Sequence, residues 1–369
     1  MAEPAVRAQR RLWRLLFPPD AVLLGDDEPP AERFEGAAFP WIEGDGVLAW
    51  IASDEAARDP RLAGASLAGA PAEVVRAVHD KAFALAAARA EGLVPPVLRG
   101  CLDALEPEAL RAPGAADAVE AAVAAWPAWA RERFTLKPRL GTSGRGRVAG
   151  RAGRLDRARL GRGLERLAER GGAMLEPWLE RTADLSVQMH LGDGVTLLGS
   201  LEQVVSPAGV FLGHRGEVDS RGRVFSGHAD EERLREAAAL VGAAARERGY
   251  VGPCGLDAFT FVDPEDRGES ESESADRRAV LRPVVELNAR FTAGTVTVGL
   301  VRRVLPRLKR ELGLAPGERL RFRFWLALAG DARAAAGQLA REPGAWLLDL
   351  DAGDTAPALL FERLERGDD

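Results

Sequence analysis

The spacing of apolar and polar residues along the chain predicts strands and helices that follow one another in mixed order. Apolar runs bounded by turn residues, and stretches that alternate apolar and polar residues, predict strands. These stretches are residues 21–25, 47–52, 134–137, 173–179, 184–191, 195–204, 252–262, 281–291 and 319–328. Apolar residues at helical spacing predict helices at 72–91, 156–170, 229–249 and 296–313. The chain carries no internal repeat.

Two pairs of the predicted strands are expected to form hairpins. Asp193 and Gly194 are residues typical of a tight hairpin turn, and apolar strands flank them. Strands 252–262 and 281–291 flank a stretch that is acidic and rich in serine, which we expect to be solvated at a hairpin tip. In the last predicted helix, Pro306 predicts a kink or a break.

Composition bounds the function classes that remain. At 369 residues and 46% hydrophobic, the chain can form two or three domains with sizeable cores. A net charge of −6 argues against a general nucleic-acid binder. Cys101 and Cys254 give neither a disulfide framework nor a metal spacing. The sequence shows neither a signal peptide nor an apolar run of membrane-spanning length, so we expect a protein of the reducing cytoplasm.

A glycine-rich stretch with several arginines, residues 136–147, suggests an anion-binding loop. Gly141, Gly144 and Gly146 let the backbone approach a bulky group, and backbone amides in such a turn can hold a phosphate. The stretch does not match the Walker A motif, because Arg147 follows the last glycine, and its glycine spacing differs from the dinucleotide fingerprint. An exposed turn between strands remains the alternative at this point.

Lysine and asparagine are rare enough in this chain to make their positions informative. The sequence has 50 basic residues, of which only Lys81, Lys137 and Lys309 are lysine, and its one asparagine is Asn288. Lysine is a compact point charge that arginine does not replace freely in a tight site. Lys137 opens the glycine-rich stretch, so a phosphate contact is one interpretation, and chance survival of the three lysines is the other.

Four polar side chains gather near the end of the second predicted hairpin. Asp257 and Glu286 lie on its two strands and can face each other across an antiparallel pair. Asn288 is two residues beyond Glu286, so both side chains point to the same face, and Arg290 continues that face. Carboxylate and amide oxygens together suit Mg²⁺. A solvated strand face is the alternative, although the immediate neighbours of Glu286 are apolar.

These motifs, taken in order, resemble the ATP-grasp ligases over residues 78 to 300. The resemblance implies that Lys81 and Lys137 hold the nucleotide phosphates. It implies that a mobile loop closes over the phosphates with Gly141, Thr142, Ser143 and Gly144. It implies that Glu176 and the backbone of Trp178 and Leu179 meet the adenine, with Asp184 near the ribose. The implied metal ligands are Asp257, Glu286 and Asn288, and the implied catalytic residues are Arg290, near the transferred phosphate, and Lys137.

The resemblance also implies a domain layout. The family fold is an α/β sandwich, with ATP between two α+β halves and an N-terminal α/β domain that helps to bind the acceptor. On this chain we expect residues 1–90 to form the N-terminal domain and residues 91–312 to form the ATP-grasp domain, with a mobile insertion at 264–279. Residues 313–369 would form a C-terminal strand and helix extension that packs on the core.

The implied activity is ligation through an acyl phosphate. A small carboxylate is activated by ATP with Mg²⁺, two ions being expected and Mn²⁺ a substitute, and an amine then attacks. Nucleic acid and membrane are not expected partners, and a homodimer is left open. A kinase of the same fold and a non-catalytic nucleotide-binding protein remain alternatives, and a carboxylase is less favoured. The sequence does not identify the acid or the amine. The residues that could either face them or pack ordinarily are His190, His214, Arg215 and Arg223.

Overall fold

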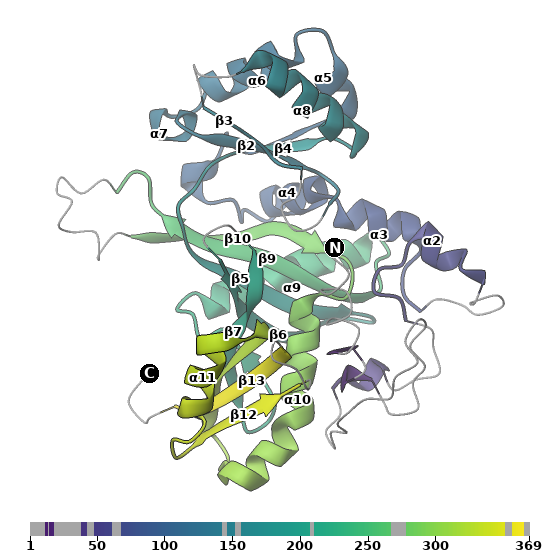
Figure 1. The fold of residues 1–369 in the computed structure, drawn as a ribbon. Helices are drawn as coiled ribbons and strands as arrows, with labels where there is room; N and C mark the ends of the chain where they lie inside the picture. The colour runs from purple at the N-terminus through teal and green to yellow at the C-terminus, as the bar shows by residue number, and fades with distance from the viewer. Residues whose placement is uncertain are drawn as a thin grey trace.

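The computed structural model contains two β-sheets with helices packed on them (Figure 1). Its strands and helices are interleaved along the chain, which confirms the mixed α/β fold class expected from the sequence. The structure describes residues 12–13, 15–17, 38–42, 48–60, 68–141, 146–151, 156–206, 210–266, 278–350 and 356–364.

The smaller sheet has four antiparallel strands and helices over one face. In spatial order the strands are β1 (Asp103–Leu105), β4 (Ala173–Pro177), β2 (Phe134–Pro138) and β3 (Val148–Gly150). The helices that follow in this part are α5 (Pro107–Arg111), α6 (Ala115–Ala124), α7 (Ala128–Arg131) and α8 (Arg157–Glu169). Phe134 and Leu136 point towards the helices and pack in one core with Leu160 and Leu164 of α8. Because side chains alternate along a strand, Thr135 and Lys137 point to the opposite face.

The larger sheet has nine strands and forms the body of the molecule. In spatial order they are β10 (Ala279–Asn288), β9 (Gly252–Val262), β5 (Arg181–Leu191), β6 (Val195–Val205), β8 (Val224–Phe225), β7 (Phe211–Asp219), β11 (Arg319–Leu328), β13 (Ala356–Arg363) and β12 (Ala345–Asp349). Neighbouring strands are antiparallel except β6 and β8. The C-terminal residues 313–364 therefore extend this sheet, because β11 pairs with β7.

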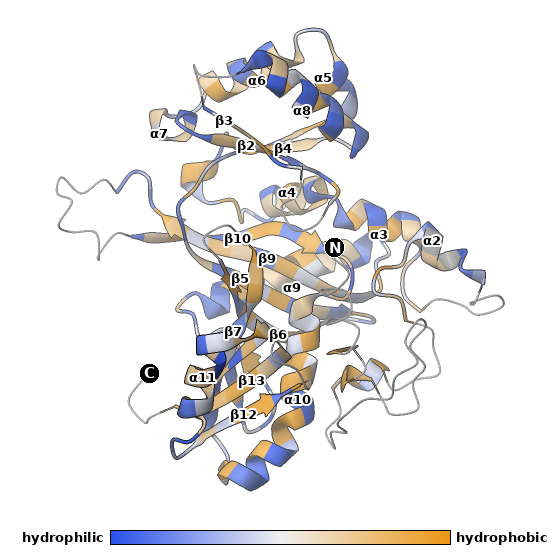
Figure 2. Ribbon diagram, in the orientation of Figure 1, coloured by the Kyte–Doolittle hydropathy of each residue, from blue (hydrophilic) through white to orange (hydrophobic). Residues whose placement is uncertain are grey.

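Helices cover the larger sheet and complete two hydrophobic cores. The helices are α2 (Asp54–Ala57), α3 (Ala72–His79), α4 (Lys81–Ala90), α9 (Glu231–Glu247), α10 (Ala293–Leu312) and α11 (Gly330–Leu339), with short 3₁₀ turns η1 (Pro40–Ile42) and η3 (Pro96–Leu98). One core joins α3, α4 and α9 to β5, β9 and β10. The other joins α10 to the strands of the C-terminal half. In Figure 2 the central strands are largely hydrophobic, while α8 and α10 carry both kinds of residue, as expected for helices with one buried face.

Most predicted elements are present, and three differ in an instructive way. The strand expected at 47–52 is wrong, because the described residues 48–52 contain no strand. The helix expected at 72–91 is divided at Asp80, whose extended backbone and side chain cap α4 through a bond from the Ala82 amide. Pro306 lies inside α10 without breaking it. The strand expected at 21–25 lies outside the described residues.

Other parts of the expected layout need separate comment. The described residues before position 91 contain helices and no strand, and the α/β domain expected for residues 1–90 stays a prediction. Strands β9 and β10 form the expected antiparallel hairpin, and residues 267–277 of the acidic insertion lie outside the described residues. Among the helices that the structure describes, none combines the length and the apolar character needed to cross a bilayer.

Candidate functional site

The hairpin of β9 and β10 brings two buried carboxylates together. Glu286 lies directly opposite Asp257 in the strand register, and an irregularity between Arg282 and Glu286 precedes this pair. Asn288 donates from Nδ2 to Asp257 Oδ2 at 2.9 Å, and Gln203 of β6 donates from Nε2 to Asp257 Oδ1 at 3.0 Å. Both oxygens of Asp257 are therefore oriented by neutral amides.

The pKa values of the two carboxylates are shifted in opposite directions because their neighbours differ. Burial, reinforced by the negative charge of Glu286, raises the pKa of Asp257. Burial alone would also raise the pKa of Glu286, but the adjacent Lys81 ammonium lowers it. Lys81 therefore favours the charged form of Glu286, while burial disfavours the charged form of Asp257.

Lys81 connects this pair to the start of the glycine-rich stretch. It is the first residue of α4, and its Nζ lies 2.7 Å from Glu286 Oε2. The same Nζ donates to the carbonyl oxygen of Gly141 at 3.1 Å. Gly141 has φ of 151°, a backbone conformation that favours glycine. Lys81 thus touches both the carboxylate pair and the root of the loop.

A second buried ionic group lies between the two sheets. Lys137 of β2 forms an ion pair with Glu176 of β4, and Arg282 of β10 donates from Nη1 to Glu176 Oε2 at 3.0 Å. Burial opposes ionisation of Glu176, but Lys137 and Arg282 outweigh it and lower its pKa to about 2. In the structure the Glu176 carboxylate is paired with these two cations, and the contact with the adenine that the resemblance implies stays a prediction.

Arg290 follows β10 and is held beside the carboxylate pair. Its Nη2 donates to Asn288 Oδ1 and its Nη1 to the carbonyl oxygen of Phe291, both at 3.0 Å. The guanidinium carbon lies 5.9 Å from the centre of the Trp50 ring. The structure therefore places Arg290, which the resemblance implies to be catalytic, next to the predicted metal ligands, with its guanidinium group towards Asn288.

Two residues of this region were missed by sequence reasoning. His79 ends α3, and its Nδ1 accepts a bond from the backbone amide of Ala289 at 3.2 Å. Burial and the nearby Arg290 lower the pKa of His79 to about 4, so the ring is neutral. Arg282 is the other missed residue. Its signal was available, since it is a charged residue inside the apolar stretch that forms β10.

The other residues that the resemblance assigns to the adenine and ribose follow β4 or lie in β5, and their roles stay predictions. Trp178 is 38% exposed, and the guanidinium carbons of Arg133 and Arg147 lie 4.9 and 4.8 Å from its ring centre. Leu179 packs on an apolar cluster that spans the two sheets. Asp184 forms an ion pair with its strand neighbour Arg181. The loop residues Thr142, Ser143 and Gly144 lie outside the described residues.

The four residues considered for the acid or amine do not gather at this site. His190 stacks on Trp41 with ring centres 4.5 Å apart. His214 is buried and shares a hydrogen bond of 2.8 Å between Nδ1 and Thr297 Oγ1. Arg215 forms an ion pair with Glu202, and Arg223 with Asp219. These contacts agree with ordinary packing.

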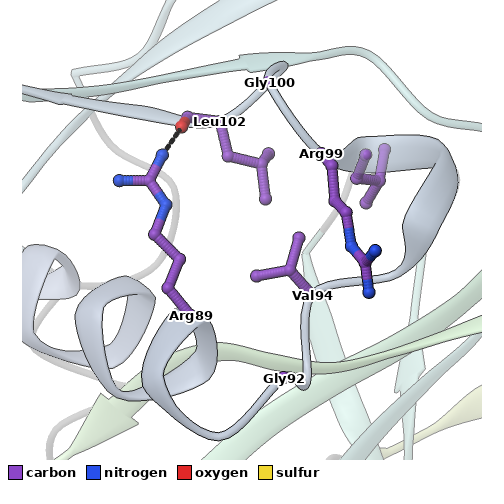
Figure 3. A pocket seen from close by; sticks show the side chains of 7 residues that line it. Arg89, Gly92, Val94, Arg99, Gly100 and Leu102 are labelled. Carbon is purple, nitrogen blue, oxygen red and sulfur yellow. Dashed lines mark hydrogen bonds between the residues drawn. The ribbon is translucent and has the colours of Figure 1, made fainter.

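A surface pocket of about 260 Å³ lies at the other end of α4 (Figure 3). Its lining includes Arg89, Arg99, Val94, Leu98 and Leu102. The length of α4 places Arg89 about 12 Å along the helix from Lys81. The pocket contains none of the carboxylates described above, so it is separate from the candidate site.

The donor set around Asp257 fits Mg²⁺ with help from a substrate. Among the described residues, no three His, Cys, Asp or Glu side chains gather as a metal cluster. Mg²⁺ commonly takes one or two carboxylates, with phosphate and water completing its shell. Asp257 and Glu286 supply the carboxylates, and the amide oxygen of Asn288 is adjacent. A cation bound there would offset the repulsion between these two buried carboxylates.

Comparison with known proteins gives matches among solved structures. No protein-family model matches the sequence, and no curated protein sequence matches it. One similar structure is the N5-carboxyaminoimidazole synthetase of Staphylococcus aureus complexed with ADP, with TM-score 0.46, 13% identity, and coverage of 82% of this chain and 72% of that one. Another is the corresponding synthase of Aspergillus clavatus with ADP and 5-aminoimidazole ribonucleotide, with TM-score 0.45, 15% identity, and coverage of 82% and 73%.

A third similar structure comes from Archaeoglobus fulgidus and is described as a member of the ATP-grasp superfamily, the family that the motifs resemble. Its TM-score is 0.38 at 17% identity, with coverage of 82% of this chain and 69% of that one. At these TM-scores the likeness does not extend to function, which has to be supported by the residues of the site itself.

Proposed function

We propose that this protein is an ATP- and Mg²⁺-dependent ligase of the ATP-grasp type, which activates a small carboxylate as an acyl phosphate for attack by an amine. One observation carries the proposal: Asp257 and Glu286 meet across the β9–β10 hairpin with Lys81 on one side and Asn288 and Arg290 on the other. Residues distant in sequence thus form one buried group of acids and cations.

The cations of this region suit a polyphosphate. Lys81 contacts Glu286, and Lys137 is close enough to lower the pKa of that same carboxylate. In our proposal both ammonium groups exchange carboxylate partners for phosphate oxygens when the nucleotide binds. The loop that begins at Gly141 would cover the phosphates, and the base and ribose would lie near Leu179 and Asp184.

Asp257, Glu286 and Asn288 would hold Mg²⁺, with two ions expected and Mn²⁺ as a substitute. When bound, the metal neutralises phosphate charge and favours transfer of the terminal phosphoryl group. Arg290 stays ionised beside these ligands and can donate hydrogen bonds to the oxygen that gains charge. Its orientation is fixed by Asn288 Oδ1 and the Phe291 carbonyl.

The proposed reaction balances in two steps. A carboxylate oxygen attacks the γ-phosphorus of ATP, a new oxygen–phosphorus bond forms, and ADP leaves. The amine nitrogen then attacks the acyl carbon, the bond to phosphate breaks, and inorganic phosphate and one proton are released with the amide. In this scheme residues 91–312 form the ATP-grasp domain, residues 1–90 help to bind the acceptor, and residues 313–369 form an extension.

A screen of amino acids and small carboxylates, each with and without amines, tests the proposal through release of ADP and phosphate. We expect ADP and phosphate in equal amounts only when an acid, an amine and Mg²⁺ are all present. ADP release that depends on an alcohol, without phosphate release, would instead identify a phosphotransferase. Nucleotide binding without turnover in any combination would identify a non-catalytic protein.

A further inference from the structure

Arg139, two residues before Gly141 in the glycine-rich stretch, is bound to Asp80, the residue that precedes Lys81. Arg139 donates from Nε to Asp80 Oδ1 at 3.0 Å and from Nη2 to Asp80 Oδ2 at 2.7 Å, which makes a two-pronged ion pair. The side chains of Arg139 and Asp80 are only 14% and 17% exposed. Paired and charge-assisted bonds of this type fix geometry more strongly than single contacts.

Backbone contacts extend this pair to Lys81 itself. The Lys81 amide donates to the carbonyl oxygen of Arg139 at 3.3 Å, while Lys81 Nζ donates to the carbonyl oxygen of Gly141 at 3.1 Å. Residues 139–141 therefore contact both ends of Lys81. Asp80 also caps α4 through Ala82, so the same carboxylate sets where the helix begins.

A second contact of α4 gives a comparison, because it attaches the helix to a neighbouring segment without contacting Lys81. At the far end of the same helix, Arg89 donates to the carbonyl oxygen of Leu102 and so ties α4 to the segment leading into β1 (Figure 3). That bond does not touch Lys81. Arg139 is further secured by an ion pair of 2.6 Å between its Nη1 and Glu106 Oε2. Two arginines thus tie α4 to its neighbours, and only the bonds of Arg139 are made next to Lys81.

We propose that Asp80 and Arg139 are positioning residues for Lys81, holding its ammonium group between Glu286 and the root of the loop. This assignment rests on the proposed function, in which Lys81 binds a nucleotide phosphate. A lysine side chain loses conformational entropy when a phosphate holds it in one place. Because the backbone on both sides of Lys81 is already fixed, less conformational entropy is lost when a phosphate binds.

Competitive acetylation of the lysines tests this positioning without any nucleotide. The sequence contains only Lys81, Lys137 and Lys309, and Lys309 is exposed, so mass spectrometry can report the first two relative to the third. Arg139→Met should raise the labelling rate of Lys81 about fivefold to tenfold, because a charge-assisted contact network is lost. Asp80→Asn keeps an acceptor for the Ala82 amide and should give a smaller rise.

Lys137 and Arg89 provide the controls. Labelling of Lys137 should not change in either variant, and the matched variant Arg89→Met should leave Lys81 labelling as in the wild type. An unchanged Lys81 rate in Arg139→Met and Asp80→Asn would overturn the proposal. An equal rise in the labelling rates of Lys81 and Lys137 would also overturn it, and so would an equal rise at Lys81 in Arg89→Met. Either result would show that the variants destabilise the protein as a whole.

Calorimetry with MgADP separates this inference from the proposed function. We expect Arg139→Met to weaken MgADP binding about tenfold, which corresponds to about 1.4 kcal/mol, while Arg89→Met binds as the wild type does. Wild-type protein that binds no MgADP would refute the proposed function, and the labelling result would still decide the structural role of the pair. Faster labelling of Lys81 with unchanged MgADP affinity would overturn its role in nucleotide binding.

Discussion

Replacing Glu176 by glutamine should be among the most damaging single changes to this protein. The glutamine keeps the size of the side chain but removes the charge that pairs with both Lys137 and Arg282. The side chains of these three residues are 7%, 15% and 6% exposed, respectively, so water cannot replace the lost anion. Removing one partner of a buried ionic group typically costs about 3–5 kcal/mol. We expect Glu176→Gln to lower the free energy of unfolding by that amount.

The matched variant Arg282→Met should cost less, about 1–3 kcal/mol, because Glu176 keeps Lys137 as a partner. Glu311→Gln provides a surface control, since its pair with Arg307 is exposed on α10 and worth at most about 0.5 kcal/mol. Urea denaturation of the three variants measures these differences. A cost below about 1 kcal/mol for Glu176→Gln would show that the group is solvated in solution. A larger cost for Arg282→Met than for Glu176→Gln would refute the assigned charge balance.

Three further predictions concern the metal ligand, pH and the insertion. Asn288→Leu should abolish Mg²⁺-dependent turnover and cost about 1–3 kcal/mol of stability, because Asp257 and Arg290 each lose a partner. Asn288→Asp should keep Mg²⁺ binding, seen as a rise in melting temperature when Mg²⁺ is added, but should slow turnover. Burial lowers the pKa of His214 to about 3, so its contribution to stability is complete above pH 6.5 and is lost as pH falls towards 3. When the pH is lowered from 6.5 to 5, the free energy of unfolding should therefore fall by about 2 kcal/mol more in the wild type than in His214→Gln, which has no imidazole to protonate. Urea denaturation at the two pH values measures this difference, and equal losses would contradict it. Deleting residues 267–276 should leave turnover within a few-fold, since they join two paired strands at a hairpin tip, and loss of folding would show that they pack.

The structure gives Asn288 a role in stability as well as in the proposed metal site. Its amide donates to Asp257 on one side and accepts from Arg290 on the other. Buried partners left unpaired cost free energy, so Asn288→Leu should destabilise the protein.

The contacts that sequence could predict are those set by a short-range pattern. The acidic stretch between two apolar strands indicated a hairpin, and a hairpin places Asp257 opposite Glu286. The amphipathic pattern of 156–170 likewise predicted α8 within a residue or two of its observed ends. In these cases the chain's own periodicity determines the neighbours.

Contacts between distant segments could not be read in this way. Arg282 meets Glu176, and His79 meets the Ala289 amide, across separations of 106 and 210 residues. Strand β7 was missed for a related reason. Its Gly213 interrupts the strand pattern, yet a Cβ at this position would lie 1.9 Å from the Phe324 carbonyl oxygen in β11. The glycine is required by a strand more than 100 residues away.

Calorimetric titration of MgADP into the wild type and into Lys137→Ala measures whether the buried cations of this site bind a nucleotide. Lys137→Ala leaves Glu176 paired with Arg282, so it should cost about as much stability as Arg282→Met, about 1–3 kcal/mol, while removing a proposed phosphate contact. We expect Mg²⁺-dependent binding to the wild type, loss of that binding in excess chelator, and at least about tenfold weaker binding to Lys137→Ala, or about 1.4 kcal/mol. Absence of binding to the wild type at millimolar MgADP, or equal affinity in the folded variant, would contradict it.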